Sequence, residues 1–267
     1  MSIIVLCSRR FAFVAFLLVC MGSGAVAEDM LEISPRSGVS LRMLIWSPED
    51  IKAVALLLPG GHGRVKVQND GSIRGLEGNF LVRMRSRFQE KGIATAVFDA
   101  PSDHSGKEGL TYEYRMTNEH ASDIGMALAA LRERFKDKPV WLIGTSRGST
   151  SAANAATNLK SGNADGLVLT SSVGISTKKG GNVRDFDLAD ITMPVLVMHH
   201  AEDNCNTTPL RGAKGIFDDL KKASRKELVI LEGGEAGQNP CQGASFHGFQ
   251  GIEDKAVDVI TQWVTKG

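Results

Sequence analysis

Residues 139–151 read P-V-W-L-I-G-T-S-R-G-S-T-S, and this stretch decides the fold. The apolar run at residues 140–143 has the length and composition of a buried strand. Gly144 and Gly148 then flank Ser146 in a G-x-S-x-G pattern, and the Ala-rich text that follows predicts a helix. At a strand–turn–helix corner of this kind the serine backbone is strained and the hydroxyl projects, while glycines remove the clashes that side chains would cause. Ser146 is therefore a candidate nucleophile.

In this context the motif resembles the nucleophile corner of the α/β-hydrolase superfamily, and the resemblance runs from about residue 41 to the C-terminus. Further strands are expected at residues 39–46, 53–58, 93–98, 166–171, 194–200 and 227–231. Continuous apolar strands separated by helical segments indicate a parallel sheet covered on both faces. The resemblance implies an α/β fold with a mostly parallel central sheet and helices on both faces. Only about two dozen residues separate residue 171 from Pro194, too few for a large lid, so we expect an open site.

The first 27 residues predict a signal peptide. Two arginines precede an apolar run at residues 11–21, and the A-V-A sequence at residues 25–27 offers a cleavage site. The run is too short to span a bilayer comfortably, although an uncleaved N-terminal anchor is the alternative interpretation. We therefore expect an exported protein, periplasmic or secreted, with no stable membrane insertion after cleavage.

Residues 28–267 are expected to form a single domain with a sizeable core. Loss of Arg9 and Arg10 with the leader changes the formal net charge from +1 to −1. No long basic or acidic block remains, so nothing recommends nucleic acid as a partner. Of the four cysteines only Cys205 and Cys241 lie outside the leader. An even pair in an exported chain predicts a disulfide, with two unpaired thiols as the alternative.

A glycine-rich loop, P-G-G-H-G at residues 59–63, follows the strand expected at residues 53–58. Backbone N–H groups in such a loop can approach a ligand closely, as an oxyanion hole requires. In the superfamily this loop supplies one donor and the residue after the nucleophile supplies the other. The resemblance thus assigns the N–H of Gly61, or of His62 one residue on, and the N–H of Arg147. A phosphate-binding loop is a weaker interpretation, because the sequence has neither G-x-x-x-x-G-K-[ST] nor a helix-opening G-x-G-x-x-G.

The resemblance also assigns the acid and the histidine. The superfamily places its acid in a loop after the strand expected here at residues 194–200, which points to Asp203, with Glu202 as the runner-up. The order along the chain is serine, acid, histidine. Of the six histidines only His247 follows Asp203. We therefore predict a catalytic triad of Ser146, Asp203 and His247.

Two other polar clusters have less to recommend them. Asp103, His104 and Ser105 are adjacent in sequence, and adjacent groups rarely converge on one reaction centre, so we interpret them as a rim loop that could contact substrate. His199 and His200 stand close to two carboxylates. Adjacent residues in a strand point to opposite faces, however, and cannot easily bind one ion. We expect no metal and no cofactor.

Together these parts predict a serine hydrolase that cleaves carboxylic esters through an acyl-enzyme, because that reaction needs nothing beyond them. The expected partner is a small-molecule ester or acyl substrate. Peptidase or thioesterase action would use the same machinery with a different pocket. A non-catalytic binding module is a third possibility, but such modules usually lose a catalytic residue or the oxyanion glycines, and this sequence keeps them all.

Overall fold

The structure is a computed structural model that describes residues 27–159, 164–176 and 180–266. Except for Ala27, the predicted signal peptide lies outside these residues. In the described part, eight strands form one sheet in the order β1-β2-β4-β3-β5-β6-β7-β8. They are β1 (Ala27–Arg36), β2 (Val39–Ser47), β3 (Ala53–Leu58), β4 (Ile93–Phe98), β5 (Val140–Thr145), β6 (Gly166–Thr170), β7 (Val195–His200) and β8 (Lys226–Leu231). β1 pairs antiparallel with β2, and β2 antiparallel with β4, whereas all other neighbours are parallel.

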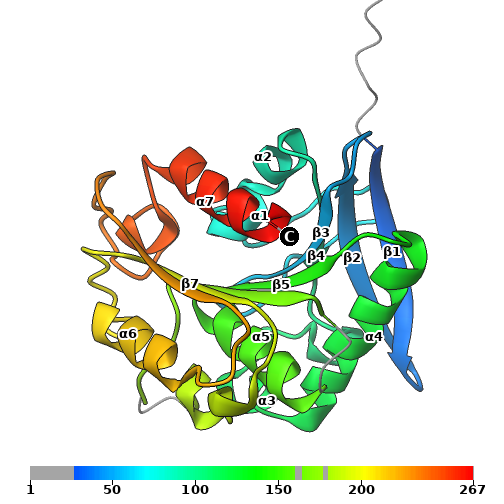
Figure 1. The fold of residues 1–267 in the computed structure, drawn as a ribbon. Helices are drawn as coiled ribbons and strands as arrows, with labels where there is room; N and C mark the ends of the chain where they lie inside the picture. The colour runs from blue at the N-terminus through cyan, green and yellow to red at the C-terminus, as the bar shows by residue number, and fades with distance from the viewer. Residues whose placement is uncertain (1–26, 160–163, 177–179, 267) are drawn as a thin grey trace, which may run out of the picture.

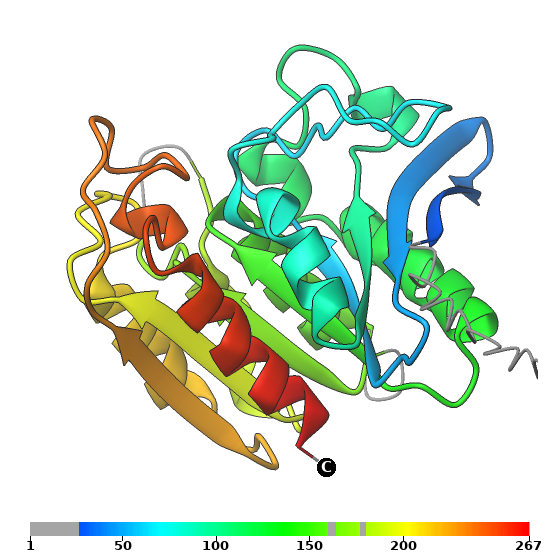
Figure 2. The ribbon, with the colours of Figure 1, turned by 90° about the horizontal axis from the view of Figure 1, so that it is seen from above.

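Helices cover both faces of this sheet (Figure 1). They are α1 (Phe80–Arg83), α2 (Arg85–Glu90), α3 (Tyr112–Arg115), α4 (Asn118–Arg134), α5 (Arg147–Asn158), α6 (Leu210–Asp219) and α7 (Glu253–Thr265). Short 3₁₀ helices lie at Ser102–His104, Val183–Asp185, Leu188–Asp190 and Phe246–Gly248. Helices α1, α2 and α7 lie on one face, as Figure 2 shows from above, and α3 to α6 lie on the other. The predicted α/β class, with a mostly parallel sheet between two helical layers, is confirmed.

The core has two parts because the central sheet is buried on both faces. Every residue of the parallel strands β3 to β7 is buried. Alternate side chains of one strand enter different clusters: Leu56 packs with α4 and α5, whereas Leu57 packs with α1, α2 and α7. This explains why the sequence of these strands is continuously apolar rather than alternating.

Two elements differ from the prediction. β1 was not expected, and it begins at Ala27, where the predicted leader ends. The helical spacing of the apolar residues in 77–91 predicts a single helix there, but this is wrong: Met84 interrupts it with φ −94° and ψ 4° and divides it into α1 and α2. Asn79 caps the first of these by accepting a hydrogen bond from the N–H of Leu81 at 3.1 Å.

The parallel strands bring several loops to one edge of the sheet. β3 and β5 end side by side, with Leu58 opposite Gly144, and β7 and β8 end with His200 opposite Leu231. In open α/β sheets, ligands bind outside these carboxyl ends. The glycine-rich loop, Ser146, the loop after β7 and the long loop before α7 therefore all belong to the same edge.

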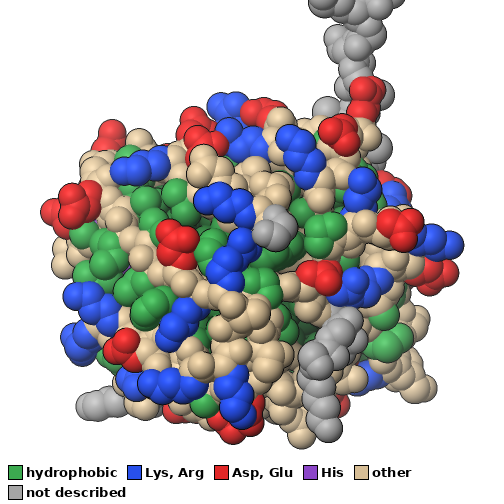
Figure 3. Space-filling view, in the orientation of Figure 1, with side chains coloured by type: hydrophobic (Ala, Val, Ile, Leu, Met, Phe, Trp, Pro, Cys, Tyr) green, Lys and Arg blue, Asp and Glu red, His purple; other side chains and the backbone are tan. Residues whose placement is uncertain are grey.

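One face of the molecule carries no large patch of a single charge among its described residues (Figure 3). On the face shown in Figure 3, the acidic and basic side chains of the described residues are interspersed. Within the described ranges, every helix is too short or too polar to cross a membrane.

Candidate active site

Ser146 occupies a strained turn between β5 and α5. Its backbone lies at φ 52° and ψ −128°, outside the regions that L-residues prefer, and its N–H donates to the carbonyl of Thr170 at 3.1 Å. A Cβ on Gly148 would lie 1.9 Å from the carbonyl oxygen of Leu58, and one on Gly144 would lie 2.5 Å from that of Gly148. Both glycines of the motif are thus required by close approach of backbones.

The imidazole of His247 is bound to a buried carboxylate. Its Nδ1 lies 2.9 Å from Oδ2 of Asp203. The carboxylate is held by two more donors, the N–H of Cys205 to Oδ1 at 3.0 Å and the hydroxyl of Thr208 to Oδ2 at 3.0 Å. The hydroxyl of Ser171 donates to the carbonyl of His247 at 2.7 Å. A carboxylate at Nδ1 favours the tautomer with its proton there, which leaves Nε2 free to act as a base.

Ser146 and His247 line the same cavity, which has a volume of about 270 Å³. The segments at residues 76–80 and 241–244 supply most of its other walls. Within the described residues, no Asp, Glu, Lys or Arg residue lines it, and His247 is its one titratable side chain apart from the disulfide-bonded Cys241. The cavity is therefore small and carries no fixed charge.

Glu202, the runner-up for the acid, takes no part in this arrangement. It is exposed, and its N–H donates to Nδ1 of His200 at 3.0 Å. The other ring nitrogen of His200 lies 2.7 Å from the carbonyl oxygen of Gly233, whereas Nε2 of His199 lies 3.6 Å from the Asp203 carboxylate. Burial lowers the pKa of His199 to about 4, so this ring is neutral at pH 7. The two histidines thus have different partners and do not share a site.

The glycine-rich loop packs directly on the serine. A Cβ on Gly60 would lie 2.7 Å from Cβ of Ser146. The N–H of Gly63 donates to the carbonyl of Gly60 at 3.2 Å and closes a turn in which Gly61 has φ +59°. That conformation suits glycine, which has no Cβ to clash.

Three backbone N–H groups are available at this place. In the described part of the chain, the N–H groups of Gly61, His62 and Arg147 donate to no protein acceptor. Gly61 lines the cavity, while Nδ1 of His62 accepts from the N–H of Arg64 at 3.1 Å. The guanidinium of Arg147 donates to the carbonyl of Leu110 at 2.9 Å.

A disulfide joins the two loops that carry the acid and the histidine. Cys205 lies two residues after Asp203, and Cys241 lies six before His247 and contributes to the cavity wall. Their Cα atoms are 4.7 Å apart across 36 residues of sequence. Surface loops of this kind are otherwise the mobile parts of a fold, so the bond restrains both partners of the hydrogen bond at Nδ1.

Replacing both cysteines with alanine is expected to lower kcat by about ten- to a hundredfold, with a smaller change in KM. Misplacing a catalytic group by about 1 Å can cost on the order of a hundredfold. The loop-entropy relation also predicts a loss of stability of about 4 kcal/mol and a lower melting temperature. Steady-state kinetics and calorimetry on Cys205→Ala/Cys241→Ala test this, after non-reducing peptide mapping of the wild type. A lower melting temperature with unchanged kcat would show that the bond serves stability alone.

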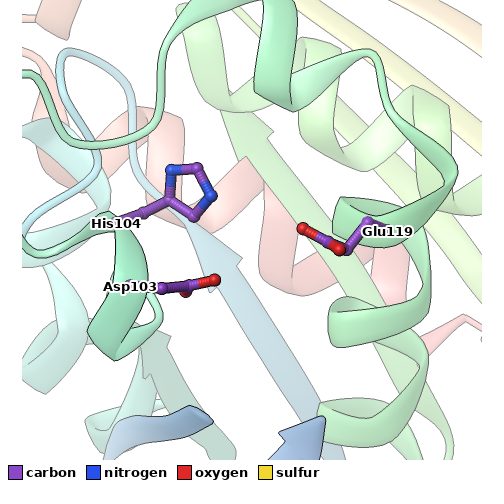
Figure 4. Close-up of side chains that lie close together, drawn as sticks. All are labelled: Asp103, His104 and Glu119. Carbon is purple, nitrogen blue, oxygen red and sulfur yellow. The ribbon is translucent and has the colours of Figure 1, made fainter. Parts of the chain in front are cut away.

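The polar trio at residues 103–105 lies elsewhere. Asp103 and His104 come close to Glu119, with potential ligand atoms within 4.8 Å of one another (Figure 4). Both carboxylates are already paired, because Nη1 of Arg36 lies 2.9 Å from Asp103 and 3.3 Å from Glu119. None of Asp103, His104 and Ser105 lines the cavity of Ser146. Ion pairing with Arg36 explains the position of Asp103, whereas His104 stacks on the ring of Tyr114 and the hydroxyl of Ser105 donates to the carbonyl of Ser102.

Sequence reasoning missed the residues that support the site. Thr208, Ser171 and the buried Arg115 carry no motif. Each contacts a residue distant in sequence: Thr208 and Ser171 contact His247, and Arg115 contacts Gly61. For Thr208 there was one weak signal, its place between the predicted acid and the start of α6 at Leu210.

We compared the chain with known proteins and solved structures. No family model matches the chain, and no curated protein matches its sequence. Solved structures do match. An esterase of Pyrococcus furiosus has a TM-score of 0.63 at 14% identity, covering 90% of this chain and 92% of that one. A cold-adapted esterase from an Arctic intertidal metagenomic library has a TM-score of 0.61 at 17% identity, covering 88% of this chain and 93% of that one.

A third match is a serine hydrolase without a lid from Xanthomonas campestris, with a TM-score of 0.58 at 15% identity, covering 87% of this chain and 94% of that one. The described part of residues 171–194 holds only two short 3₁₀ helices in the place where a lid would be inserted. At such low identity the likeness establishes the fold, and this chain has the α/β-hydrolase fold.

Proposed function

We propose that the protein is a serine hydrolase that cleaves carboxylic esters of small molecules through an acyl-enzyme. The observation that carries this proposal is the shared cavity: a serine on a strained strand–helix corner and a histidine bound to a buried carboxylate line the same space. The fold supports it, since the similar structures include esterases and a serine hydrolase.

In the first half of the reaction, Oγ of Ser146 attacks the ester carbonyl carbon while Nε2 of His247 takes the hydroxyl proton. The carbonyl oxygen becomes an oxyanion, which accepts hydrogen bonds from the N–H of Arg147 and from the loop N–H of Gly61 or His62. One such donor contributes about 3 kcal/mol to the transition state. Asp203 stabilises the imidazolium that forms.

The tetrahedral intermediate then collapses. The C–O bond to the alcohol breaks, and the alcohol oxygen takes the proton from Nε2 of His247, which leaves the acyl group on Ser146. Water adds to this acyl-enzyme with His247 again as the base, and the acid is released as the serine regains its proton. No group beyond these residues is needed.

The cavity favours small, uncharged substrates. A volume of about 270 Å³ is slightly below the roughly 300–1,000 Å³ of pockets that hold drug-sized ligands, which suits a short acyl or alcohol group. Phe80 and Leu76 offer apolar contact, and Asn79 and Gln242 are the amide side chains in the wall. A charged group would enter without a partner of opposite charge, at a cost of several kcal/mol. This favours ester hydrolysis over peptidase action on charged chains.

Turnover of matched substrates tests the proposal. We expect the purified protein, after leader cleavage, to hydrolyse p-nitrophenyl acetate and butyrate with a higher kcat/KM than p-nitrophenyl decanoate. The p-nitroanilide and the thioester of the same short acids should react more slowly. Faster cleavage of the anilide or the thioester would assign peptidase or thioesterase activity instead, and no turnover of any member would favour a binding module.

A further inference from the structure

Arg115, at the end of α3, is buried beneath the glycine-rich loop. Its side chain is 1% exposed. The guanidinium donates through Nη2 to the carbonyl oxygens of Pro59 at 3.3 Å and Gly61 at 3.4 Å. It also donates through Nη1 to the hydroxyl of Ser151 at 2.6 Å and through Nε to the carbonyl of Leu110 at 3.4 Å. All four partners are neutral oxygens.

A buried guanidinium is normally paired with a carboxylate, because an unpaired charge in the interior is costly. Within the described residues, Arg115 makes no ion pair. Burial, together with the nearby charge of Arg147, lowers the pKa of Arg115 to about 9 against an opposing effect of Tyr112, so the group still carries its charge at pH 7. An unneutralised cation is therefore kept directly behind the loop that faces Ser146.

We infer that Arg115 is a positioning residue for the oxyanion hole, holding the loop carbonyls on its own side so that the loop N–H groups face the cavity. This inference rests on the proposed function. In a planar trans peptide the C=O and N–H groups point in opposite directions. The carbonyl of Gly61 and the N–H of His62 share one peptide, so anchoring the former on Arg115 turns the latter away from it. Gly61 lines the cavity and Arg115 does not. The loop therefore lies between Arg115 and the cavity.

The charge adds to this orientation. A cation at the carbonyl oxygen draws electron density from the amide and strengthens its N–H as a donor. In a site of low dielectric it also stabilises an oxyanion on the far side of the peptide. Both effects grow as negative charge develops on the substrate, so they act on the transition state more than on the bound ester.

The sequence of the loop fits this role. Gly63 has φ +69°, and a Cβ there would lie 2.8 Å from Nη2 of Arg115 and 2.5 Å from Cδ1 of Leu110. The last glycine of the loop thus makes room for the guanidinium. Gly60 makes room for Ser146 on the other side. The spacing of the glycines is explained by a loop that is packed between a cation and a nucleophile.

The test compares Arg115→Met and Arg115→Lys with wild type and with Asp123→Asn. Asp123 is also fully buried, but it binds Arg36 and Tyr114 away from the cavity. We expect Arg115→Met to lower kcat on p-nitrophenyl butyrate by about a hundredfold with KM little changed, as for loss of an oxyanion donor. The kcat of Arg115→Lys should lie between those of Arg115→Met and the wild type, because lysine keeps the charge and loses the fork of donors. Asp123→Asn should lower the melting temperature without this loss of kcat.

The second measurement is the affinity for a trifluoromethyl ketone, which forms a tetrahedral adduct, against that for the non-reacting butyramide. We expect Arg115→Met to lower the affinity for the ketone in proportion to the loss of kcat/KM, and to leave the affinity for butyramide within about twofold of the wild-type value. Equal weakening of both ligands, or unchanged ketone affinity, would overturn the inference. If Arg115→Met does not fold, Arg115→Lys decides, and full activity in it would also overturn the inference. Wild-type protein without turnover or ketone binding would instead refute the proposed function.

Discussion

Replacing Ser146 with alanine is expected to lower kcat for ester hydrolysis by a factor on the order of 10⁴ to 10⁶. The reason is that, in the proposed mechanism, the hydroxyl of Ser146 attacks the ester and carries the acyl group. Alanine is no larger than serine, so the corner between β5 and α5 should keep its shape, and the melting temperature should change little. A fluorophosphonate probe gives a second measurement, since it should label the wild type and leave Ser146→Ala unlabelled.

Ser105→Ala is the matched control for this experiment. Ser105 lies next to His104 in sequence but does not line the cavity, so its loss should leave labelling and turnover unchanged. Labelling that persists in Ser146→Ala and disappears in Ser105→Ala would move the nucleophile to the loop after β4 and contradict the proposed site.

Replacing Asp203 with asparagine is expected to lower kcat by about 10³- to 10⁴-fold while the protein remains folded. The N–H of Cys205 donates to Oδ1, which fixes the amide oxygen of the asparagine at that position. Its NH₂ group then faces Nδ1 of His247, where the carboxylate oxygen lay at 2.9 Å. An amide donor at Nδ1 favours the tautomer with its proton on Nε2, and this tautomer cannot take the proton of the serine.

Glu202→Gln removes the neighbouring carboxylate and should stay within about twofold of wild-type kcat, because Glu202 is exposed and does not contact His247. Steady-state kinetics on both variants decide between them. A large loss in Glu202→Gln with little change in Asp203→Asn would reverse the assignment of the acid.

Much of the fold could be predicted because its signals are local. A buried parallel strand is a continuous apolar run, and the corner at Ser146 needs two glycines at fixed spacing. The order of the superfamily led us to expect Asp203 and His247 together, and the structure places Nδ1 of His247 2.9 Å from the Asp203 carboxylate. β1 was missed because it is a half-exposed antiparallel edge strand that starts where the leader was expected to end. Edge strands lack the continuous apolar run that marks a central strand.

The supporting contacts could not be predicted, because they join segments that only the folded chain brings together. Arg115 reaches back 54 residues to Gly61, and Ser171 reaches forward 76 residues to His247. Neither residue belongs to a motif. The break between α1 and α2 at Met84 was missed for a related reason: the apolar spacing of that segment continues through the break, and the cap at Asn79 marks only its beginning.

The glycines beside Ser146 bear on how chains of this fold can change over evolutionary time. A side chain at Gly148 would meet the carbonyl of Leu58 at 1.9 Å, and Leu58 is the last residue of a buried central strand. Substitution there displaces the core, so selection for a folded protein retains the glycine whether or not the protein is an enzyme. Ser146 has no such protection, since alanine fits the same corner. In a lineage that loses catalysis, we therefore expect the serine to drift first and the glycines to persist, leaving the outline of the motif in proteins that no longer use it.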